Sequence, residues 1–230
     1  MTQIAQSIRV AVDIVIFTVQ DNALKVILIR MKKKPFTGIW AFPGGLIDSE
    51  ESLDAASKRE LREKTGVRSP YLEQLYAFSD PKRDPNGRVI SIAYFALINS
   101  GPISSKGTDG GIKLITTTKY SDIGWFDVLK LPKLAYDHKN IAKYALQRLR
   151  WKLEYTNIAY SLLPSRFTLS ELRRVYEIIL DRPLDRRNFQ RKILSLKMLR
   201  RTPKKQVGRH RPARLYEFKV RKPVIIEGVS

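Results

Sequence analysis

The sequence predicts two domains: a mixed α/β sandwich, of α+β or α/β type, over residues 1–153, and a small domain of helices and a β-hairpin over residues 154–230. Two observations lead to this prediction. In the first part, runs rich in Val and Ile, which favour strands, surround a glycine pair and one amphipathic helix. After Glu154 the pattern changes to short segments with helical spacing and many basic residues. A chain of 230 residues is long enough for two such cores.

Apolar runs place the strands of the first domain. The first two runs predict a β-hairpin, because only residues 20–22 separate them. The small, polar segment 101–111 is expected to be a loop on the ligand side, and Asp137 is expected to cap a helix from 138 to about 153. His138 beside this cap is assigned a structural role. Strands are expected over residues 8–19, 24–31, 40–42, 71–78, 89–98 and 123–126.

The most specific pattern of the chain begins at the pair Gly44-Gly45. These glycines are expected to turn tightly and to bring backbone N–H groups close to a ligand. Ser52 is a suitable N-cap for a helix that reaches about residue 65, and Gly66 is suited to end it. The buried stripe of this helix is expected to consist of Leu53, Ala56 and Leu61.

Charged residues lie together on this helix. Glu60, Glu63 and position 64 are spaced i, i+3 and i+4 and therefore share one face. Three carboxylates there would hold hard divalent cations, the arrangement that hydrolysis of a pyrophosphate needs. The third position is Lys64, so a metal site would lose a ligand and gain a repelling charge. An alternative interpretation is a solvated face with ion pairs.

Composition limits the function classes. The chain has 43 Lys and Arg against 22 Asp and Glu, a net charge of +21, which indicates nucleic acid or an anionic surface as partner. Residues 155–230 hold 19 of these basic residues and 6 of the acidic ones, a net charge of +13. Without cysteine there is neither a disulfide nor thiolate catalysis. The absence of a signal-peptide pattern and of a long apolar run predicts a cytoplasmic location.

The second domain is predicted to be a winged helix-turn-helix. Helices are expected over 155–163, from about 168 to 180, and over 186–198. Strands over 199–202 and 215–220 would enclose a basic hairpin loop, which after a cationic helix is typical of a wing. The alternative is a charged tail or basic arm. The third helix would bury one face and leave basic residues on the other, with buried side chains at Phe189, Ile193 and Leu196.

The spacing of the glycine–helix segment closely resembles the Nudix box, with Lys64 as its departure. The matching positions are Gly45, Glu51, Arg59, Glu60, Glu63, Gly66 and Val67. Other segments make nearly the whole chain similar to the Nudix-related transcriptional regulators, the NrtR-like family, in which a Nudix α/β/α sandwich is joined to a C-terminal winged helix. These segments are residues 35–45, 83–85, 134–138, 162–169 and 187–189.

This resemblance implies a repressor of genes of NAD or sugar metabolism. Its Nudix domain would sense a metabolite, commonly ADP-ribose and in related members a pentose, and the bound form would release DNA. Phe36, Trp40 and Phe78 are possible partners of an adenine or members of the core. A sensor that does not cleave its signal is consistent with Lys64. The residues implied for the effector site are Gly44, Gly45, Arg59, Glu60, Glu63 and Arg83.

Double-stranded DNA is the expected macromolecular partner. A single winged helix has little area for specificity, so a homodimer on a palindromic operator is expected. No cofactor is expected to be required, no metal site is expected beyond Glu60 and Glu63, and Mg²⁺ would serve only residual hydrolase activity. The alternative function is an ADP-ribose pyrophosphatase with an appended nucleic-acid-binding domain. DNA contacts are expected from Arg186, Arg187, Asn188, Gln190, Arg191, Lys204, Lys205, Arg209 and Arg211.

Overall fold

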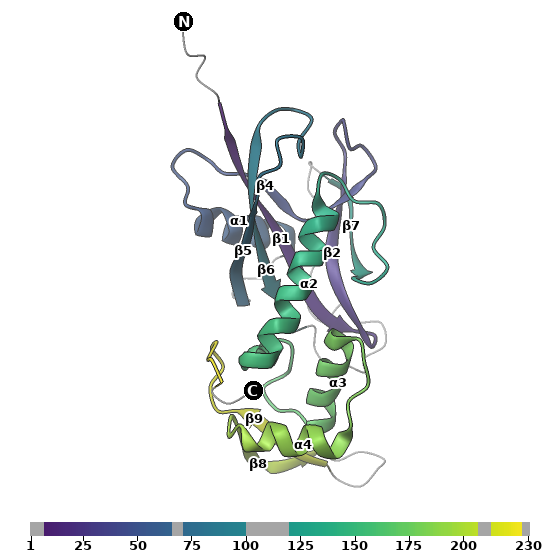
Figure 1. Ribbon diagram of the computed structural model, residues 1–230, viewed down its shortest axis with the longest axis vertical. Helices are drawn as coiled ribbons and strands as arrows, with labels where there is room; N and C mark the ends of the chain where they lie inside the picture. The colour runs from purple at the N-terminus through teal and green to yellow at the C-terminus, as the bar shows by residue number, and fades with distance from the viewer. Residues whose placement is uncertain (1–6, 66–70, 100–119, 207–212, 227–230) are drawn as a thin grey trace, which may run out of the picture. The chain divides into compact units, whose positions relative to one another are not determined.

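The computed structural model describes residues 7–65, 71–99, 120–206 and 213–226. Its contacts divide the chain into two compact units (Figure 1). The first comprises residues 1–17, 25–96 and 112–145, and the second comprises 18–24, 97–111 and 146–230. The predicted domain boundary at residue 153 stays a prediction. The expected loop 101–111 and the helix stop at Gly66 lie outside the described residues.

A mixed sheet of seven strands forms the centre of the first unit, as the apolar runs predict. Five strands follow the order β3-β2-β1-β6-β5, while β4 pairs with β1 and β7 pairs with β2. Asp21 and Asn22 join β1 to β2 with positive φ angles of 50° and 58°, which suits the two-residue turn of a β-hairpin. The strands are β1 Arg9–Gln20, β2 Ala23–Met31, β3 Trp40–Ala41, β4 Gly44–Leu46, β5 Tyr71–Phe78, β6 Val89–Leu97 and β7 Tyr120–Asp127.

The glycine pair differs from its prediction, because it forms a strand rather than a tight turn. In β4, Gly44 pairs with Asp13 and Gly45 with Val12 of β1. A Cβ on Gly44 would lie 2.3 Å from the Val12 carbonyl oxygen, and a Cβ on Gly45 would lie 2.5 Å from Oε1 of Glu60. Close packing on both sides, and not a left-handed backbone, therefore explains the two glycines.

Helix α1, Leu53–Thr65, has the expected N-terminus. The Ser52 hydroxyl accepts a hydrogen bond from the backbone N–H of Ala55 at 3.2 Å. Ala56 and Leu61 are buried, as predicted. Glu60 is buried as well, with 2% of its surface exposed, because this face of the helix lies beside Gly45.

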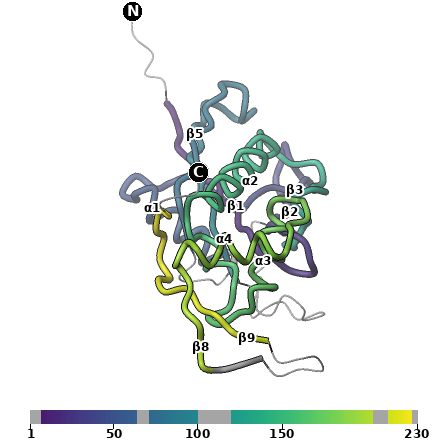
Figure 2. Tube along the Cα trace, turned by 60° about the horizontal axis from the view of Figure 1, so that its bottom comes forward, coloured from purple at the N-terminus to yellow at the C-terminus, as the bar shows by residue number. Residues whose placement is uncertain are grey.

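The second unit contains the end of α2, His138–Tyr155, followed by a short helix η1, Ile158–Ser161. Thr168 caps the next helix, and its capping box with Glu171 satisfies two backbone donors. Strands β8 and β9 run side by side as an antiparallel hairpin (Figure 2). The remaining elements are α3 Leu169–Leu180, α4 Arg186–Ser195, β8 Leu199–Gln206 and β9 Ala213–Phe218.

Element ends in the second unit differ from the predictions by a few residues. Helix α4 ends at Ser195, so Leu196 is its C-cap and only Phe189 and Ile193 form its buried stripe. Strand β8 continues to Gln206, which shortens the loop of the predicted wing. The core lies where predicted, since Phe167 packs on Phe218 with ring centroids 5.1 Å apart. Within the described ranges, no helix combines the length and apolar character that crossing a membrane requires.

Candidate functional site

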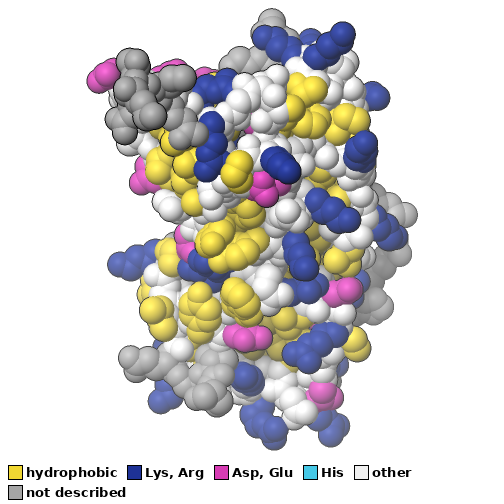
Figure 3. Space-filling model, turned by 45° about the horizontal axis from the view of Figure 1, so that its top comes forward, with side chains coloured by type: hydrophobic (Ala, Val, Ile, Leu, Met, Phe, Trp, Pro, Cys, Tyr) yellow, Lys and Arg dark blue, Asp and Glu magenta, His cyan; other side chains and the backbone are white. Residues whose placement is uncertain are grey.

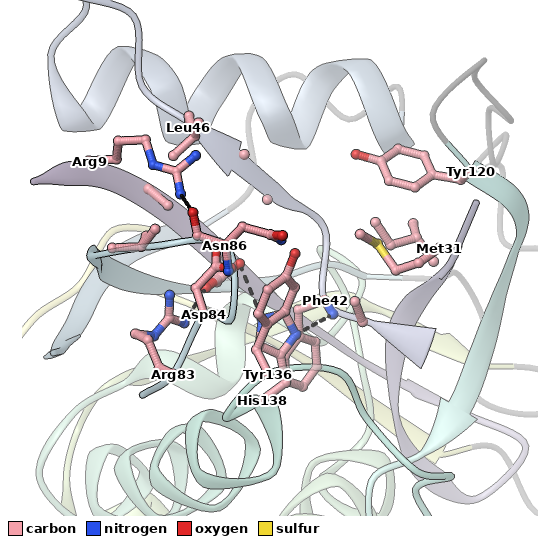
Figure 4. Close-up of a pocket in the computed structure, with 17 residues that line it drawn as sticks. Arg9, Met31, Phe42, Leu46, Arg83, Asp84, Asn86, Tyr120, Tyr136 and His138 are labelled. Atoms are coloured by element: carbon pink, nitrogen blue, oxygen red, sulfur yellow. Dashed lines mark hydrogen bonds and ion pairs between the residues drawn. The ribbon is translucent and has the colours of Figure 1, made fainter. Parts of the chain in front are cut away.

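A cavity of about 280 Å³ opens in the first unit beside the glycine strand β4. Figure 4 shows side chains from several separate elements around it. One wall is made by β1 and β4, another by the loop between β5 and β6, and a third by the aromatic side chains of Tyr120 and Tyr136. Its polar lining includes Arg9, Asp13, Arg83, Asp84, Asn86, Tyr120, Tyr136 and His138.

A local pairing brings residues 134–138 to the cavity. Leu134 forms a parallel bridge with Trp40, and the Ala135 N–H donates to the Trp40 carbonyl at 2.8 Å. Tyr136 follows with a φ of 52°, an uncommon conformation for an aromatic residue, and packs on Phe36 at a centroid distance of 4.4 Å. This turn places Tyr136 on the lining and starts helix α2 directly behind it.

A buried polar network lies at the floor of the cavity. Arg83 donates to both oxygens of Asp137, from Nε at 3.1 Å and from Nη2 at 2.8 Å, and its Nη2 also lies 3.3 Å from Oδ2 of Asp13. Ser91 donates to the same Asp13 oxygen at 2.5 Å, and Nε2 of His138 lies 3.4 Å from the other. The network therefore joins β1, β6, the β5–β6 loop and the start of α2.

These contacts fix the charges of the network. Burial raises the pKa of Asp13, but its contacts with His138, Ser91 and Arg83 outweigh burial and lower that pKa to about 2. Burial lowers the pKa of Arg83, whereas Asp137 and Asp13 raise it above the ordinary value of an arginine. Both side chains are therefore ionised at neutral pH, and the floor of the cavity keeps a fixed cation.

The two tyrosines of the cavity stay neutral. Burial raises the pKa of the Tyr120 phenol, and the nearby charges of Glu63 and Asp13 raise it further. Burial also raises the pKa of Tyr136, with a further contribution from Asp84. In Figure 4 the two rings approach the cavity from different elements. A neutral phenol keeps its O–H group, and a phenol O–H can donate a hydrogen bond to a ligand.

The acidic residues of the box lie next to the cavity lining but are engaged with Arg59. Its guanidinium binds Glu51 through two bonds of 2.8 Å and Glu60 through one of 2.8 Å, and Oε2 of Glu63 lies 3.9 Å away. The hydrogen bond from Arg59 lowers the pKa of Glu51, and the same bond raises the pKa of Arg59. The Lys64 side chain lies outside the described residues.

The carboxylates of the box are the groups that a divalent cation would use. Among the side chains that the structure describes, no group of three or more His, Asp and Glu residues is placed to hold a metal ion. Arg59 binds both oxygens of Glu51 and Oε1 of Glu60, which are oxygens that a metal would need. The expectation that no metal binds beyond Glu60 and Glu63 stays a prediction.

The six residues expected at the effector site separate into two groups. Gly44, Gly45 and Arg83 line the cavity, whereas Arg59, Glu60 and Glu63 form the neighbouring acidic cluster. Sequence reasoning missed Asp13, although a carboxylate inside an apolar strand is a usable signal. It also missed Arg9, Tyr136 and the place of His138 on the cavity, for which the sequence carries no local signal.

Helix α4 presents a second candidate site. The Asp185 side chain caps it by accepting from the Asn188 N–H at 2.8 Å. Its inner face buries Phe189, which contacts Tyr176 edge-on at a centroid distance of 5.3 Å, together with Ile193. The opposite face consists of the exposed Arg186, Arg187, Asn188 and Arg191 and the partly exposed Gln190. Arg191 is oriented by a 2.9 Å hydrogen bond to the Asn188 side chain.

The hairpin after α4 adds further cations. Lys204 and Lys205 belong to β8, but their side chains, like Arg209 and Arg211 as a whole, lie outside the described residues. The described strands expose three cations that were not predicted as contacts, and Arg200 among them pairs with Glu217 at 2.6 Å. The three are Arg200, Arg201 and Arg214. Lys and Arg side chains are scattered over the face drawn in Figure 3.

Comparison with known proteins identifies both parts of the chain. The NUDIX domain family matches residues 7–149, and the NrtR DNA-binding winged helix domain matches residues 159–218. An ADPR responsive transcriptional repressor NtrR from Acinetobacter baylyi is 38% identical over 210 residues, which are 90% of this chain and 80% of that protein. An ADP-ribose pyrophosphatase from Methanocaldococcus jannaschii is 37% identical over 143 residues, 62% of this chain and 74% of the enzyme.

Solved structures of NrtR from Shewanella oneidensis give the same result. The protein in complex with a 27mer DNA is 36% identical and matches with a TM-score of 0.75 over 91% of this chain and 93% of that one. Its NUDIX domain in complex with ADP ribose is 34% identical, with a TM-score of 0.53 over 65% of this chain and 93% of that one. The predicted combination of a mixed α/β Nudix fold with a winged helix is thereby confirmed. The chain belongs to the NrtR family of Nudix-related transcriptional regulators.

Proposed function

We propose that this protein is a DNA-binding repressor whose affinity for its operator is lowered by ADP-ribose. The observation that carries the proposal is the pairing of two sites in one chain: a cavity with a fixed Arg83 cation and neutral tyrosine donors, and a helix α4 with an open basic face. The relatives include a repressor named as ADPR responsive, 38% identical to this chain, and a NUDIX domain solved with ADP ribose, 34% identical.

The cavity has the chemistry that a nucleoside diphosphate sugar requires. Arg83, which is bound to Asp137, and Arg9 of β1, which donates to the Asn86 carbonyl of the same loop, supply positive charge for a diphosphate. Tyr120, Tyr136 and Asp84 supply donors and an acceptor for ribose hydroxyl groups. Gly44 and Gly45 line the cavity without side chains, so a ligand can approach their backbone closely.

The second unit has the chemistry of a major-groove reader. A capped helix with a buried apolar face leaves Arg187 and Arg191 free to reach base edges and phosphates. Arg201 and Arg214 on the hairpin strands extend the basic surface beyond the helix. We further propose a homodimer on a palindromic operator with half-sites about 10.5 bp apart or a multiple of this, because one winged helix reads too few base pairs alone.

The test is binding of the protein to a fluorescent duplex from the promoter of its own operon. We expect specific binding that ADP-ribose weakens and that NAD, AMP and pentoses leave unchanged. A Kd for DNA that stays constant at saturating ADP-ribose would contradict the proposal. A pentose that releases DNA where ADP-ribose has no effect would replace the effector with a sugar.

The second candidate function is hydrolysis of ADP-ribose. It is favoured by the retention of Glu51, Glu60 and Glu63 at the box spacing and by the 37% identity with the pyrophosphatase. We propose that any such activity is residual and needs added Mg²⁺, because Arg59 occupies the carboxylates and Lys64 replaces one. Release of AMP with Mg²⁺ or Mn²⁺ measures it. Rapid turnover by the wild type would favour the enzyme, and a gain of activity in Lys64→Glu would support the sensor.

A further inference from the structure

Arg83 is shared between the cavity and the start of helix α2. Its guanidinium is almost fully buried, with 4% of the side chain exposed, and it binds the Asp137 carboxylate at two points. Asp137 directly precedes α2, and its carbonyl oxygen accepts from the N–H groups of Asn140 and Ile141 in the first turn. The ion pair therefore ties the floor of the cavity to the N-terminus of this helix.

The two carboxylates bound to Arg83 are not held equally. Asp13 is fixed by Ser91 and His138 in addition to Arg83. For the Asp137 carboxylate, Arg83 is the only ion-pair or hydrogen-bond partner among the described residues. Asp137 also lies at a helix N-terminus, where the helix dipole stabilises a negative charge without a cation. Of the two ion pairs of Arg83, the one with Asp137 therefore costs less free energy to break than the one with Asp13.

An anion in the cavity competes for the same guanidinium. A diphosphate that approaches Arg83 brings negative charge close to Asp137 and Asp13, and like charges at this range in a buried site repel strongly. One guanidinium cannot balance a diphosphate and two carboxylates at once. Binding of the anion and closure of the Arg83–Asp137 pair therefore oppose each other.

Opening of the Arg83–Asp137 pair also affects residues outside the cavity, because Asp137 precedes helix α2. It is one uninterrupted helix of 18 residues, whose first part belongs to the first unit and whose residues 146–155 belong to the second. Within the second unit, Leu153 is buried, and its carbonyl oxygen accepts from the hydroxyl of Tyr176 on α3 at 3.5 Å. A change at the first turn of α2 thus acts on a helix that is part of the DNA-binding unit.

We propose that the Arg83–Asp137 ion pair is the switch contact of this regulator: it is closed in the DNA-binding form, and the diphosphate of the effector opens it by drawing Arg83 away from α2. This inference rests on the proposed function, since it assumes an effector with a diphosphate and a DNA-binding form. In this proposal Asp137 competes with the diphosphate for the Arg83 guanidinium and so weakens ligand binding. If Asp137 only positioned Arg83, it would strengthen ligand binding.

The variant Asp137→Asn separates these two roles, because it removes the charge and keeps the shape. We expect its Kd for ADP-ribose to fall about 5-fold or more and its Kd for operator DNA, without ligand, to rise, because loss of the ion pair shifts the protein from the DNA-binding form toward the effector-binding form. Weaker ADP-ribose binding in Asp137→Asn would overturn the proposal. So would an unchanged Kd for DNA.

Asp84→Asn is the matched control. Asp84 lines the same cavity, but its carboxylate accepts from the backbone N–H of Asn86 in its own loop and not from α2. We expect Asp84→Asn to change the Kd for ADP-ribose and to leave the Kd for DNA without ligand within about 2-fold. An equal effect of both variants on DNA binding would show that general perturbation of the cavity, and not the switch contact, is responsible.

Hydrogen exchange on the wild-type protein tests the proposal without any variant. We expect the backbone amides in the first two turns of α2 to exchange faster when ADP-ribose is bound, because the helix start has lost its anchor. Unchanged or slower exchange there would overturn the proposal. A wild-type protein that does not bind ADP-ribose would instead contradict the proposed function, so the two failures are distinguishable.

Discussion

The backbone N–H of Phe42 donates to Nδ1 of His138 at 2.9 Å, across 96 residues of sequence. Nε2, on the other side of the ring, lies 3.4 Å from Oδ1 of Asp13. His138 is 2% exposed and lies parallel to the Phe42 ring, with a centroid distance of 5.6 Å. The histidine thus connects the strand segment before β4 to the buried carboxylate below the cavity.

Replacing His138 by Ala is expected to destabilise the protein by about 1–3 kcal/mol, because the Phe42 N–H would lose its acceptor inside the structure. Thermal or urea unfolding measures the change. Lys139→Ala, at the exposed next position of the same helix, is the control and should stay within about 0.5 kcal/mol of wild type. A loss no larger than that of the control would show that this hydrogen bond is not important for stability.

Asp13 should make stability depend on pH in the acid range. Its pKa falls from 3.8 to about 2 on folding, so its contribution is complete above pH 4 and is lost as the pH drops through about 2. The shift corresponds to about 2 kcal/mol at neutral pH. Urea unfolding between pH 5 and pH 2 should show this decrease for the wild type and a smaller one for Asp13→Asn. The same dependence of the unfolding free energy on pH in both proteins would contradict the lowered pKa of Asp13.

Gly44→Ala is expected to cost about 1–3 kcal/mol, because the new Cβ would meet the Val12 carbonyl oxygen at 2.3 Å and the backbone of β1 would have to move. Gly124→Ala is the matched control in another strand of the sheet, since its Cβ would meet only the Phe126 ring at 3.4 Å. Unfolding midpoints of both variants measure the difference. Equal values would mean that β4 adjusts without strain.

Arg187→Ala and Arg191→Ala should each weaken operator binding without loss of stability, because both side chains are exposed on α4. If each neutralises one phosphate, the slope of log K against log salt should become less steep by about 0.9. If one of these arginines contacts a base instead, its alanine variant should lose about 1–3 kcal/mol of DNA-binding free energy, and only with the operator sequence. Fluorescence anisotropy at several salt concentrations distinguishes the two. Lys58→Ala on α1 is the control for total charge.

Local patterns account for what the sequence predicted well. The Ser52 cap was expected, because a short polar side chain before an amphipathic run acts on backbone groups within one turn. The first hairpin was predicted because only three residues separate its two apolar runs. Predictions failed where an element end depended on packing, as at Ser195, where α4 stops three residues early.

The cavity could be predicted only in part. Of the residues that the family resemblance implies for the effector site, Gly44, Gly45 and Arg83 line the cavity, and Arg59 and Glu60 pair with each other beside it; their roles toward a ligand stay a prediction. The sequence spacing of a helix face shows which charges are neighbours. It does not show whether they are turned toward a cavity or toward each other.

The sequence by itself determined the two domains, the caps, the box with Lys64 and the excess of basic residues, because each of these is written in neighbouring residues or in composition. Only the tertiary structure decided that Arg83 contacts both Asp13, which lies 70 residues away in β1, and Asp137, which lies 54 residues away at the start of α2. Contacts at such separations follow from strand order and from the turn at Tyr136, and side chains that meet in this way leave no periodic pattern along the chain.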